Sequence, residues 1–371
     1  MITAGVPTTR PIRVLLLPSR PYTPYRRNYV PGSGPDPHAF RQELATLGIV
    51  FDTLDPSGFP FNPLAGKHPL LQSIDPYRTL KVLLRRRAYD LIISGNEGAA
   101  VLLVLLRRWF RFDTPVVVWD LAPSSEWRLR AFLQDLTLPK VDGIMALIAI
   151  QKQYIAERWG PQIPVTVVGY SVDTEFYHPT VPSCSGDYLL SVGDDAGRDY
   201  ETLLRAADTL PIALRIRTSM PLFLDPVRHS NIQIIGDRFD PPAFRSLYAG
   251  CNFVILPLLP HTRNASGAST VLETAAMGKA AIVSDSDGVR DFIVPGETCL
   301  TVPAGDAGAL RAAIERLCRE PETCLRLGTN ARQFVQDRFS TVAAARLFAS
   351  AVREHAHPVP RRSSLTATVS G

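Results

Sequence analysis

The sequence has no long hydrophobic run and no paired cysteines. Its longest strongly apolar run, Ala99–Leu106, is far shorter than the roughly 20 residues that a membrane-spanning helix needs. The first residues, Met1–Arg13, lack the apolar stretch of a signal peptide. The five cysteines form an odd, scattered set without a C-x-x-C pair, which is typical of a reducing cytoplasm and not of a structural metal site. We therefore expect a cytoplasmic protein that holds no metal.

Positive charge is concentrated in the first half of the chain. Residues 1–170 hold 20 Lys and Arg against 13 Asp and Glu, a net charge of +7, whereas residues 171–371 hold 20 against 22, a net charge of −2. A basic region attracts anionic membranes, acidic acceptors or nucleic acids. A solvated surface rich in arginine explains the charge more simply, and we expect no nucleic-acid partner.

Part of this charge lies beside apolar and aromatic residues. The basic residues are Arg85–Arg87, Arg107, Arg108 and Arg111, and their apolar neighbours are Leu102–Leu106, Trp109 and Phe110. Basic side chains next to aromatic ones favour docking on an anionic bilayer. We expect at most a weak, peripheral membrane contact.

Apolar runs alternate with amphipathic runs through the first half of the chain, and a length of 371 residues favours two domains. Continuous Val, Ile and Leu runs, typical of strands buried on both faces, predict strands at Arg13–Pro18, Val50–Leu54, Asp90–Ser94, Pro115–Trp119, Gly143–Leu147 and Val165–Val168. Helices are predicted at His38–Leu47, Tyr77–Arg87, Gly98–Trp109, Glu126–Asp135 and Ile150–Trp159. Such alternation predicts an α/β fold with a parallel, doubly wound sheet.

The same pattern restarts after the predicted linker Thr180–Asp187. Strands are predicted at Tyr188–Val192, Ala213–Arg217, Ile232–Ile235, Asn252–Leu256 and Ala280–Ser284, and helices at Asp199–Leu210, Pro242–Ala249, Thr270–Met277, Ala307–Arg319, Pro321–Asp337 and Thr341–His355. No G-x-G-x-x-G follows the first strand of either half, which disfavours a nicotinamide-dependent enzyme.

The richest segment for chemistry is Leu256–Ser284, where a strand, a loop and a helix follow one another. The helix is predicted to begin near Thr270, and free backbone N–H groups at a helix start bind anions such as a diphosphate. Gly267 lets the backbone approach a phosphate closely, and Ser269 follows it in the loop. Glu273, one turn inside the helix, is placed to accept hydrogen bonds from a ribose diol. An ordinary loop–helix–strand unit, with Glu273 complementing the helix dipole, explains the same residues equally well.

Several ordered motifs of the second half resemble those of GT-B glycosyltransferases of family 4 (glycosyl transferases group 1). Leu272–Lys279 resembles the second half of the family signature E-G-F-G-x-x-x-x-E-A-M-A-x-G-x-P-V-V, and Ser284–Asp291 and Gly296–Asp306 resemble the motifs after it. Upstream, Val168–Tyr177 resembles the interdomain segment and Val192–Tyr200 the V-G-R…K strand and loop. The match covers about 170 residues, and several motifs in order are more specific than any single one.

The resemblance implies two Rossmann-like domains that face each other across a cleft. The N-terminal domain, 1–179, is then expected to bind the acceptor, and the C-terminal domain, 180–340, the nucleotide sugar. A helix over 341–355 is expected to pack back near the N-terminal domain, followed by a disordered tail over 356–371. The implied reaction moves a sugar from a UDP- or GDP-linked donor to a hydroxyl or amine, with retention and without cofactor or metal.

Site residues follow from the resemblance, including its departures. Ala265 stands where the family has its first glutamate, and Asp194 and Asp195 occupy the region of a phosphate-binding arginine. Arg198 is then the candidate for the diphosphate, with Arg263 or Lys279 as substitutes. Gly32 and Gly34 loosely resemble a Gly-Gly loop under the donor phosphate, and Asp120 follows a strand near the place where relatives carry a cleft histidine. The predicted nucleotide-binding residues are Gly32, Gly34, Gly267, Ser269, Thr270 and Glu273, and the predicted catalytic ones are Asp120, Arg198 and Arg263.

Other interpretations stay open at this point. Asp285–Asp287 imitates the D-x-D metal motif of GT-A enzymes, but it lies too far along the chain for that fold. Ser94–Gly98, at another strand end, is a candidate for the acceptor site, and the acceptor itself is a saccharide, a lipid-linked intermediate or a small natural-product scaffold. Ala265 and the missing histidine also suit a non-catalytic binding or scaffold protein, while an inverting GT-B transferase or a sugar-nucleotide epimerase shares the two-domain plan.

Overall fold

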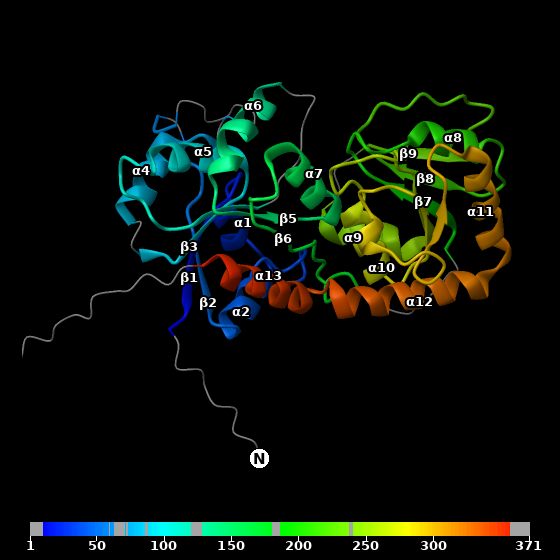
Figure 1. Cartoon of the computed structure of the whole chain (residues 1–371). Helices are drawn as coiled ribbons and strands as arrows, with labels where there is room; N and C mark the ends of the chain where they lie inside the picture. The colour runs from blue at the N-terminus through cyan, green and yellow to red at the C-terminus, as the bar shows by residue number, and fades with distance from the viewer. Residues whose placement is uncertain are drawn as a thin grey trace, which may run out of the picture.

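The protein has two α/β lobes joined side by side (Figure 1). The computed structural model describes residues 10–58, 60–62, 71, 73–85, 88–119, 128–179, 186–236 and 240–356. Each lobe contains one six-stranded sheet, and all of its strand pairs are parallel. The predicted GT-B architecture of two doubly wound domains is confirmed.

The N-terminal sheet has the order β2-β1-β3-β4-β5-β6. Its strands are β1 (Ile12–Leu17), β2 (Ile49–Thr53), β3 (Leu91–Ser94), β4 (Val116–Trp119), β5 (Gly143–Ala146) and β6 (Val165–Val167). The helices are α1 (Thr23–Arg27), α2 (Ala39–Thr46), α4 (Pro76–Arg85), α5 (Glu97–Leu106), α6 (Arg128–Thr137) and α7 (Ala149–Trp159). The strand order reverses between β1 and β3, and the carboxyl ends of such strands flank the place where open α/β sheets bind ligands.

The C-terminal sheet is also six-stranded and parallel, but its order is β12-β11-β10-β7-β8-β9, so two strands lie beyond its first strand β7 where the N-terminal sheet has one beyond β1. Its strands are β7 (Tyr188–Val192), β8 (Leu214–Arg217), β9 (Ile232–Ile235), β10 (Cys251–Leu256), β11 (Ala281–Ser284) and β12 (Leu300–Val302). Its helices are α8 (Tyr200–Ala207), α9 (Pro241–Gly250), α10 (Ala268–Ala276), α11 (Ala307–Arg319) and α12 (Pro321–Arg338), with the short 3-10 helix η3 (Arg290–Phe292) after β11. Here the order reverses between β7 and β10.

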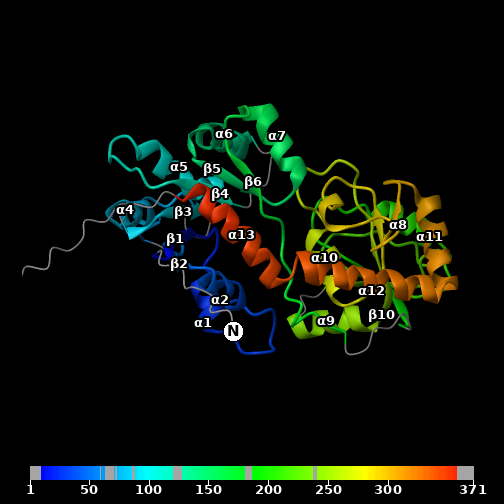
Figure 2. The same ribbon diagram turned by 60° about the horizontal axis from the view of Figure 1, so that its bottom comes forward.

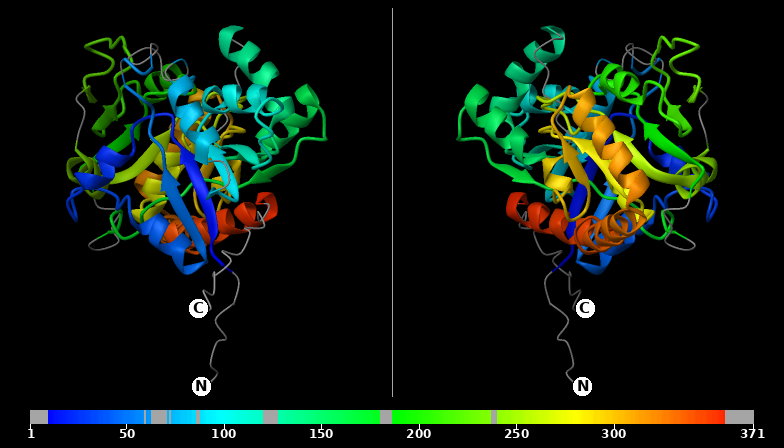
Figure 3. Two further views of the ribbon diagram at one scale, coloured as in Figure 1. Left: turned by 90° about the vertical axis from the view of Figure 1, so that its left-hand side faces the viewer. Right: turned by 90° about the vertical axis from the view of Figure 1, so that its right-hand side faces the viewer.

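The last helix, α13 (Thr341–His355), returns to the N-terminal lobe. It continues from the end of α12 and crosses the N-terminal lobe beside α2 (Figure 2; end views in Figure 3). Phe348 of α13 lies in the core of that lobe, with its ring centroid 5.5 Å from that of Phe40 and 5.1 Å from that of Trp119. The N-terminal lobe therefore needs the C-terminal end of the chain to complete its core.

Local differences from the sequence prediction have simple causes. Helix α10 begins at Ala268 and not near Thr270, because Gly267 at φ +85° adopts the left-handed conformation that starts the turn early. Helix α8 begins at Tyr200, since the Asp199 side chain caps it by accepting from the Thr202 amide. The short helix α1 was not predicted.

Two further predictions concern the tail and membrane spans. Residues 357–371 lie outside the described residues. Within the described part of the chain, no helix has the length and apolarity to cross a membrane.

Candidate functional site

The start of α10 lies at the cleft between the lobes. Gly267 precedes the helix, and a Cβ there would stand 3.0 Å from a methyl group of Leu256, so the loop needs glycine for space as well as for its φ. The first amides of a helix have no intrahelical partner and carry partial positive charge. Ser269 lines two cavities, one of about 280 Å³ and one of about 540 Å³. The helix start is therefore open to a ligand from both sides.

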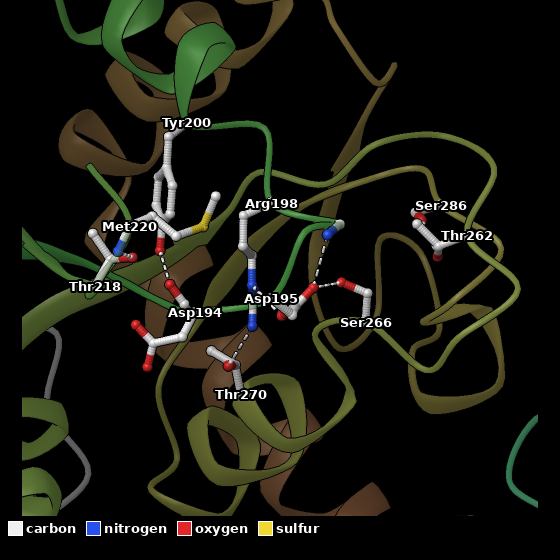
Figure 4. Close-up of polar contacts among 12 residues, drawn as sticks. Asp194, Asp195, Arg198, Tyr200, Thr218, Met220, Thr262, Ser266, Thr270 and Ser286 are labelled. Carbon is white, nitrogen blue, oxygen red and sulfur yellow. Dashed lines mark hydrogen bonds and ion pairs between the residues drawn. The ribbon is translucent and has the colours of Figure 1, made fainter. Parts of the chain in front are cut away.

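Arg198 supplies a buried positive charge to the smaller cavity (Figure 4). Its guanidinium donates from Nε to Asp195 at 2.9 Å and from Nη2 to Thr270 of α10 at 3.0 Å. The Nη1 group is buried and has no hydrogen-bond partner among the described residues. An unpaired buried donor is costly, so this geometry favours an anionic ligand in the cavity.

Asp195 holds Arg198 in this position. Besides Arg198, it accepts hydrogen bonds from the Gly197 amide at 3.0 Å and from the Ser266 hydroxyl, so it ties the loop after β7 to the loop before α10. The sequence interpretation saw Asp195 only as a replacement for a lost arginine. Its i,i+3 spacing from Arg198 was the signal for a positioning role.

The neighbouring Asp194 is also engaged. It accepts hydrogen bonds from the Ser219 amide and hydroxyl and forms an ion pair with Arg217. Burial raises its pKa, but these bonds outweigh burial and hold the pKa below its usual value. Asp194 therefore fixes the loop to the adjacent strand β8 and stays ionised.

Glu273 faces the larger cavity and is held by two tyrosines. Its Oε2 accepts a hydrogen bond at 2.8 Å from the hydroxyl of Tyr248, a fully buried residue of α9, and the Tyr177 hydroxyl also donates to it. Burial raises the pKa of Glu273 to about 7, although the bonds from Tyr248 and Tyr177 and the charge of Arg198 lower it. The sequence interpretation missed both tyrosines because Tyr248 lies in another helix and Tyr177 in the interdomain segment.

The other positively charged candidates lie elsewhere. Arg263 is exposed, its guanidinium lies 4.6 Å from the ring centroid of Tyr154 in α7, and it lines neither of these two cavities. Lys279 is buried beyond the C-terminal end of α10 and donates from Nζ to the Cys251 carbonyl at 2.7 Å. Of the three candidates, the structure brings only Arg198 to the helix start. Lys279 as a substitute diphosphate ligand was therefore a wrong interpretation.

The N-terminal lobe contributes a loop and a strand end. Gly32 has φ +82°, and Gly34 lies against α9 so closely that a Cβ would stand 3.1 Å from Pro241. The Asp36 amide donates to Asp173 in the interdomain segment at 2.8 Å. Neither glycine is among the residues that line the two cavities, whereas the following residues 35–37 line the larger one. Asp120 lies outside the described residues.

Two other predicted features, the acidic pair after β11 and the segment after β3, are mostly engaged in contacts outside the two cavities. Asp285 and Asp287 both form ion pairs with Arg290, at 3.0 and 2.6 Å, and no group of three or more potential metal ligands occurs within the described part of the chain. In the segment Ser94–Gly98, Glu97 is buried and pairs with Arg130 at 2.6 Å, so it supports α6. Of that segment, Gly95 alone lines the larger cavity.

Comparisons with known proteins agree with this geometry. Residues 230–334 match the family model "Glycosyl transferases group 1". The putative glycosyltransferase EpsD of Bacillus subtilis is 23% identical over 306 residues, which cover 74% of this chain and 77% of that protein.

Solved structures share the whole two-lobed fold. Sucrose-phosphate synthase from Thermosynechococcus elongatus superimposes with a TM-score of 0.68 at 18% identity, over 93% of this chain and 99% of the other. Anabaena Alr3699/HepE, solved with UDP-glucose, gives a TM-score of 0.62 at 17% identity, over 92% and 100%. The predicted resemblance is confirmed, and the chain is a glycosyltransferase of the GT-B fold that carries the glycosyl transferases group 1 segment in its C-terminal lobe.

Proposed function

We propose that this enzyme transfers a sugar from a nucleoside-diphosphate sugar to an acceptor hydroxyl or amine. The observation that carries the proposal is the buried Arg198, which lines a cavity at the start of α10 and has an unpaired Nη1. Arg198 and the helix amides stabilise the departing diphosphate, because fixed donors in a cavity with little water act strongly on developing charge. Thr270 and Asp195 keep the guanidinium in place.

Glu273 is proposed to bind the ribose of the donor. A carboxylate has about four lone-pair sites, so hydrogen bonds from Tyr248 and Tyr177 leave capacity for the ribose diol. Ser269 and Gly267, at the start of α10, are proposed to lie beside the diphosphate of the bound nucleotide. We propose a uridine nucleotide as the first donor to test, since Alr3699/HepE, which shares the fold, was solved with UDP and with UDP-glucose. GDP is the alternative.

Retention and metal independence are part of the proposal. Asp195 is the carboxylate that lines the smaller cavity, and its oxygens already accept from Arg198, Gly197 and Ser266, so it is a poor nucleophile. A front-face reaction led by stabilisation of the leaving group fits this arrangement, as does the resemblance to family 4. Arg198 and the helix start supply the positive charge that a metal supplies in GT-A enzymes.

We also propose a weak contact of the N-terminal lobe with anionic membranes. Trp109 and Leu84 are 85% and 75% exposed, and the exposed Arg85, Arg108 and Arg111 surround them in sequence. Leu84 and Arg85 end α4, and the other three residues follow α5. These two helices lie toward the end of the molecule farthest from the C-terminal lobe (Figures 1 and 2). Arg107 is excluded from this set because it pairs with Asp142 at 2.7 Å. Aromatic tips flanked by arginine favour an anionic lipid surface.

Donor binding and turnover test the proposed function together. UDP and GDP are titrated by calorimetry, and the matching donor sugars are then assayed for release of nucleotide with and without candidate acceptors. The expected result is micromolar binding of one nucleotide and slow hydrolysis of its sugar, lost in Arg198→Ala. Binding without any hydrolysis or transfer would favour the non-catalytic scaffold that Ala265 suggests. Inversion in the product would assign an inverting GT-B enzyme.

A further inference from the structure

The larger cavity, of about 540 Å³, lies between the carboxyl ends of the N-terminal strands and α10 of the C-terminal lobe, whose Ser269 and Glu273 also line it. Residues that follow or end β1, β3, β4, β5 and β6 line it, so it sits at the point where the strand order reverses. The opposite side is formed by α2 and α13. Its apolar walls are Leu16, Phe40, Leu44, Phe51, Trp119 and Phe348.

The aromatic walls are fixed by their packing on one another. The ring centroid of Phe348 lies 5.5 Å from that of Phe40, 5.9 Å from that of Phe51 and 5.1 Å from that of Trp119. Phe348 comes from α13, which forms helix–helix contacts with α2. The aromatic walls of the cavity are therefore preformed before a ligand binds.

The volume of this cavity between the lobes is that of a small-molecule site and not of a packing defect. Cores are close-packed with few voids larger than a water molecule, whereas small-molecule sites measure roughly 300–1,000 Å³. Most of the cavity wall is apolar, so the cavity favours a ligand that has an apolar body.

The larger cavity adjoins the smaller, charged one. Leu147, Tyr170 and Ser269 line both, and Glu273 lies on the wall of the larger cavity nearest the C-terminal lobe. A molecule in the apolar part thus approaches the same helix start at which Arg198 is held. The two cavities are therefore neighbouring parts of one site: Arg198 and Asp195 line the smaller one, the larger one is mostly apolar, and Glu273 lies on the side of the larger one that faces the donor.

We propose that the apolar cavity binds the acceptor, and that the acceptor is an alcohol with an apolar body and not a free polysaccharide. This inference rests on the proposed function for the meaning of the adjoining charged cavity. The acceptor oxygen forms a bond to the anomeric carbon of the donor while the bond from that carbon to the diphosphate oxygen breaks. The hydroxyl proton passes to the released diphosphate. Either an alkyl chain or an aromatic ring can form the apolar body of such an alcohol.

Alkyl and aryl glucosides serve as probes of the full-length enzyme. Methyl, octyl and phenyl β-glucoside, each below its micellar concentration, are titrated by calorimetry with and without UDP. Octyl β-glucoside is expected to bind on the order of 100-fold more tightly than the methyl compound, since most of its additional methylene groups become buried. The phenyl compound shows whether a ring is preferred to a chain. Equal affinity of all three probes would overturn the inference.

A cavity-filling variant locates the binding. Ala344 is buried on the cavity side of α13, one turn before Phe348, and Ala344→Phe is expected to weaken octyl β-glucoside binding at least tenfold while leaving UDP affinity unchanged. Ser350→Phe, on the exposed side of the same helix, is the matched control and should change neither. Thr341→Phe, at a partly exposed position on the cavity wall, tests the same point should Ala344→Phe fail to fold.

The outcomes separate this inference from the proposed function. Selective octyl binding that the filling variants remove, in a protein that binds no nucleoside diphosphate, would support the apolar site and reject the donor assignment. UDP binding with no effect of chain length would keep the donor site and reject the apolar acceptor. Loss of UDP and octyl β-glucoside to the same extent in Ala344→Phe would assign the cavity to the nucleotide and overturn the inference.

Discussion

Both lobes are built on a six-stranded parallel sheet with one reversal of strand order, but they line different kinds of cavity. At the start of α10 the C-terminal lobe presents a buried arginine, an aspartate and hydroxyl groups, all cross-linked by hydrogen bonds. At the same edge of its own sheet the N-terminal lobe presents aromatic rings. Because both sheets are built from buried aliphatic runs, the difference comes from the loops and helices beyond the strand ends. The fold supplies the location of a site, and those segments supply its chemistry.

The strongest test of this difference between the lobes is to remove the positive charge of Arg198. Arg198→Ala should lower kcat by about 10²–10³-fold, the loss typical of deleting one fixed donor to a developing anion. Steady-state kinetics with saturating donor measures it. Arg198→Lys keeps a charge but not the fork that reaches Asp195 and Thr270 together, so it should recover only part of the loss. A fall below threefold in the alanine variant would remove Arg198 from the reaction.

Substitution of Glu273 tests the nucleotide-binding site and is expected to have a smaller effect than substitution of Arg198. Glu273→Ala should weaken nucleotide binding by about 2–4 kcal/mol, thirtyfold or more, because charge-assisted bonds to the ribose are lost. Glu273→Gln should lose less, and wild type should prefer ribo- over 2′-deoxy-nucleotides. Titration calorimetry measures both.

Stability gives a second measure of Glu273. The fold should survive in the alanine variant with a lower melting temperature, since the buried Tyr248 hydroxyl loses its acceptor, a cost of about 1–3 kcal/mol. A residue that only complements the helix dipole would cost about 0.3–1 kcal/mol and leave nucleotide affinity unchanged. That pattern would move the donor elsewhere.

The pH dependence of binding sharpens the same assignment. Burial raises the pKa of Glu273 from 4.5 to about 7, so the folded protein holds this proton more tightly than the unfolded chain. Its contribution to stability therefore falls as pH rises from 4.5 to about 7, by about 3 kcal/mol in total. Ribose binding needs the ionised form, so nucleotide affinity should rise about tenfold between pH 6 and pH 8. Glu273→Gln should show a smaller rise than the wild type, because only the ionisation of the nucleotide's own terminal phosphate is left, and an unchanged slope in that variant would contradict the role of Glu273.

Membrane binding is proposed for the N-terminal lobe alone, and substitutions there are expected to change vesicle binding only moderately. The fraction of protein that sediments with anionic vesicles at low salt should fall by about half in Trp109→Ser, since interfacial aromatic burial contributes beside the arginine charge. Phe223→Ser, which removes a 92% exposed aromatic from the C-terminal lobe, is the control and should have no effect. Equal sedimentation with neutral and anionic vesicles would reject the contact.

The smallest effect is expected at the acidic pair that imitates a metal motif. Asp287→Ala should change kcat by less than about threefold, since Asp287 interacts with the exposed side chains of Arg290 and His261 and lines neither cavity, and ion pairs at the surface contribute little. Activity should also persist in excess chelator. Loss of activity in chelator, with rescue by Mn²⁺, would show that metal charge and not Arg198 acts on the diphosphate.

Much of the fold followed from local pattern. Continuous aliphatic runs such as Leu91–Ser94 and Val116–Trp119 predicted buried parallel strands, and their boundaries differ by about a residue or two from those observed. The places of Gly267 before a helix and of Glu273 within its first turns were predicted correctly, because spacing along the chain fixes them. The short helix α1 escaped prediction, since five residues carry too little periodicity.

The sequence alone determined two α/β halves, the glycine-led start of α10 and the presence of a carboxylate one turn later, because these depend on neighbours within a few residues. Only the tertiary structure distinguished Arg198 from Arg263 and Lys279, since burial and partners separate residues that look alike in sequence. It also brought Tyr248 and Tyr177 to Glu273, and Phe348 of the last helix to Trp119. Such contacts join segments tens to hundreds of residues apart, and the packing of whole lobes decides them.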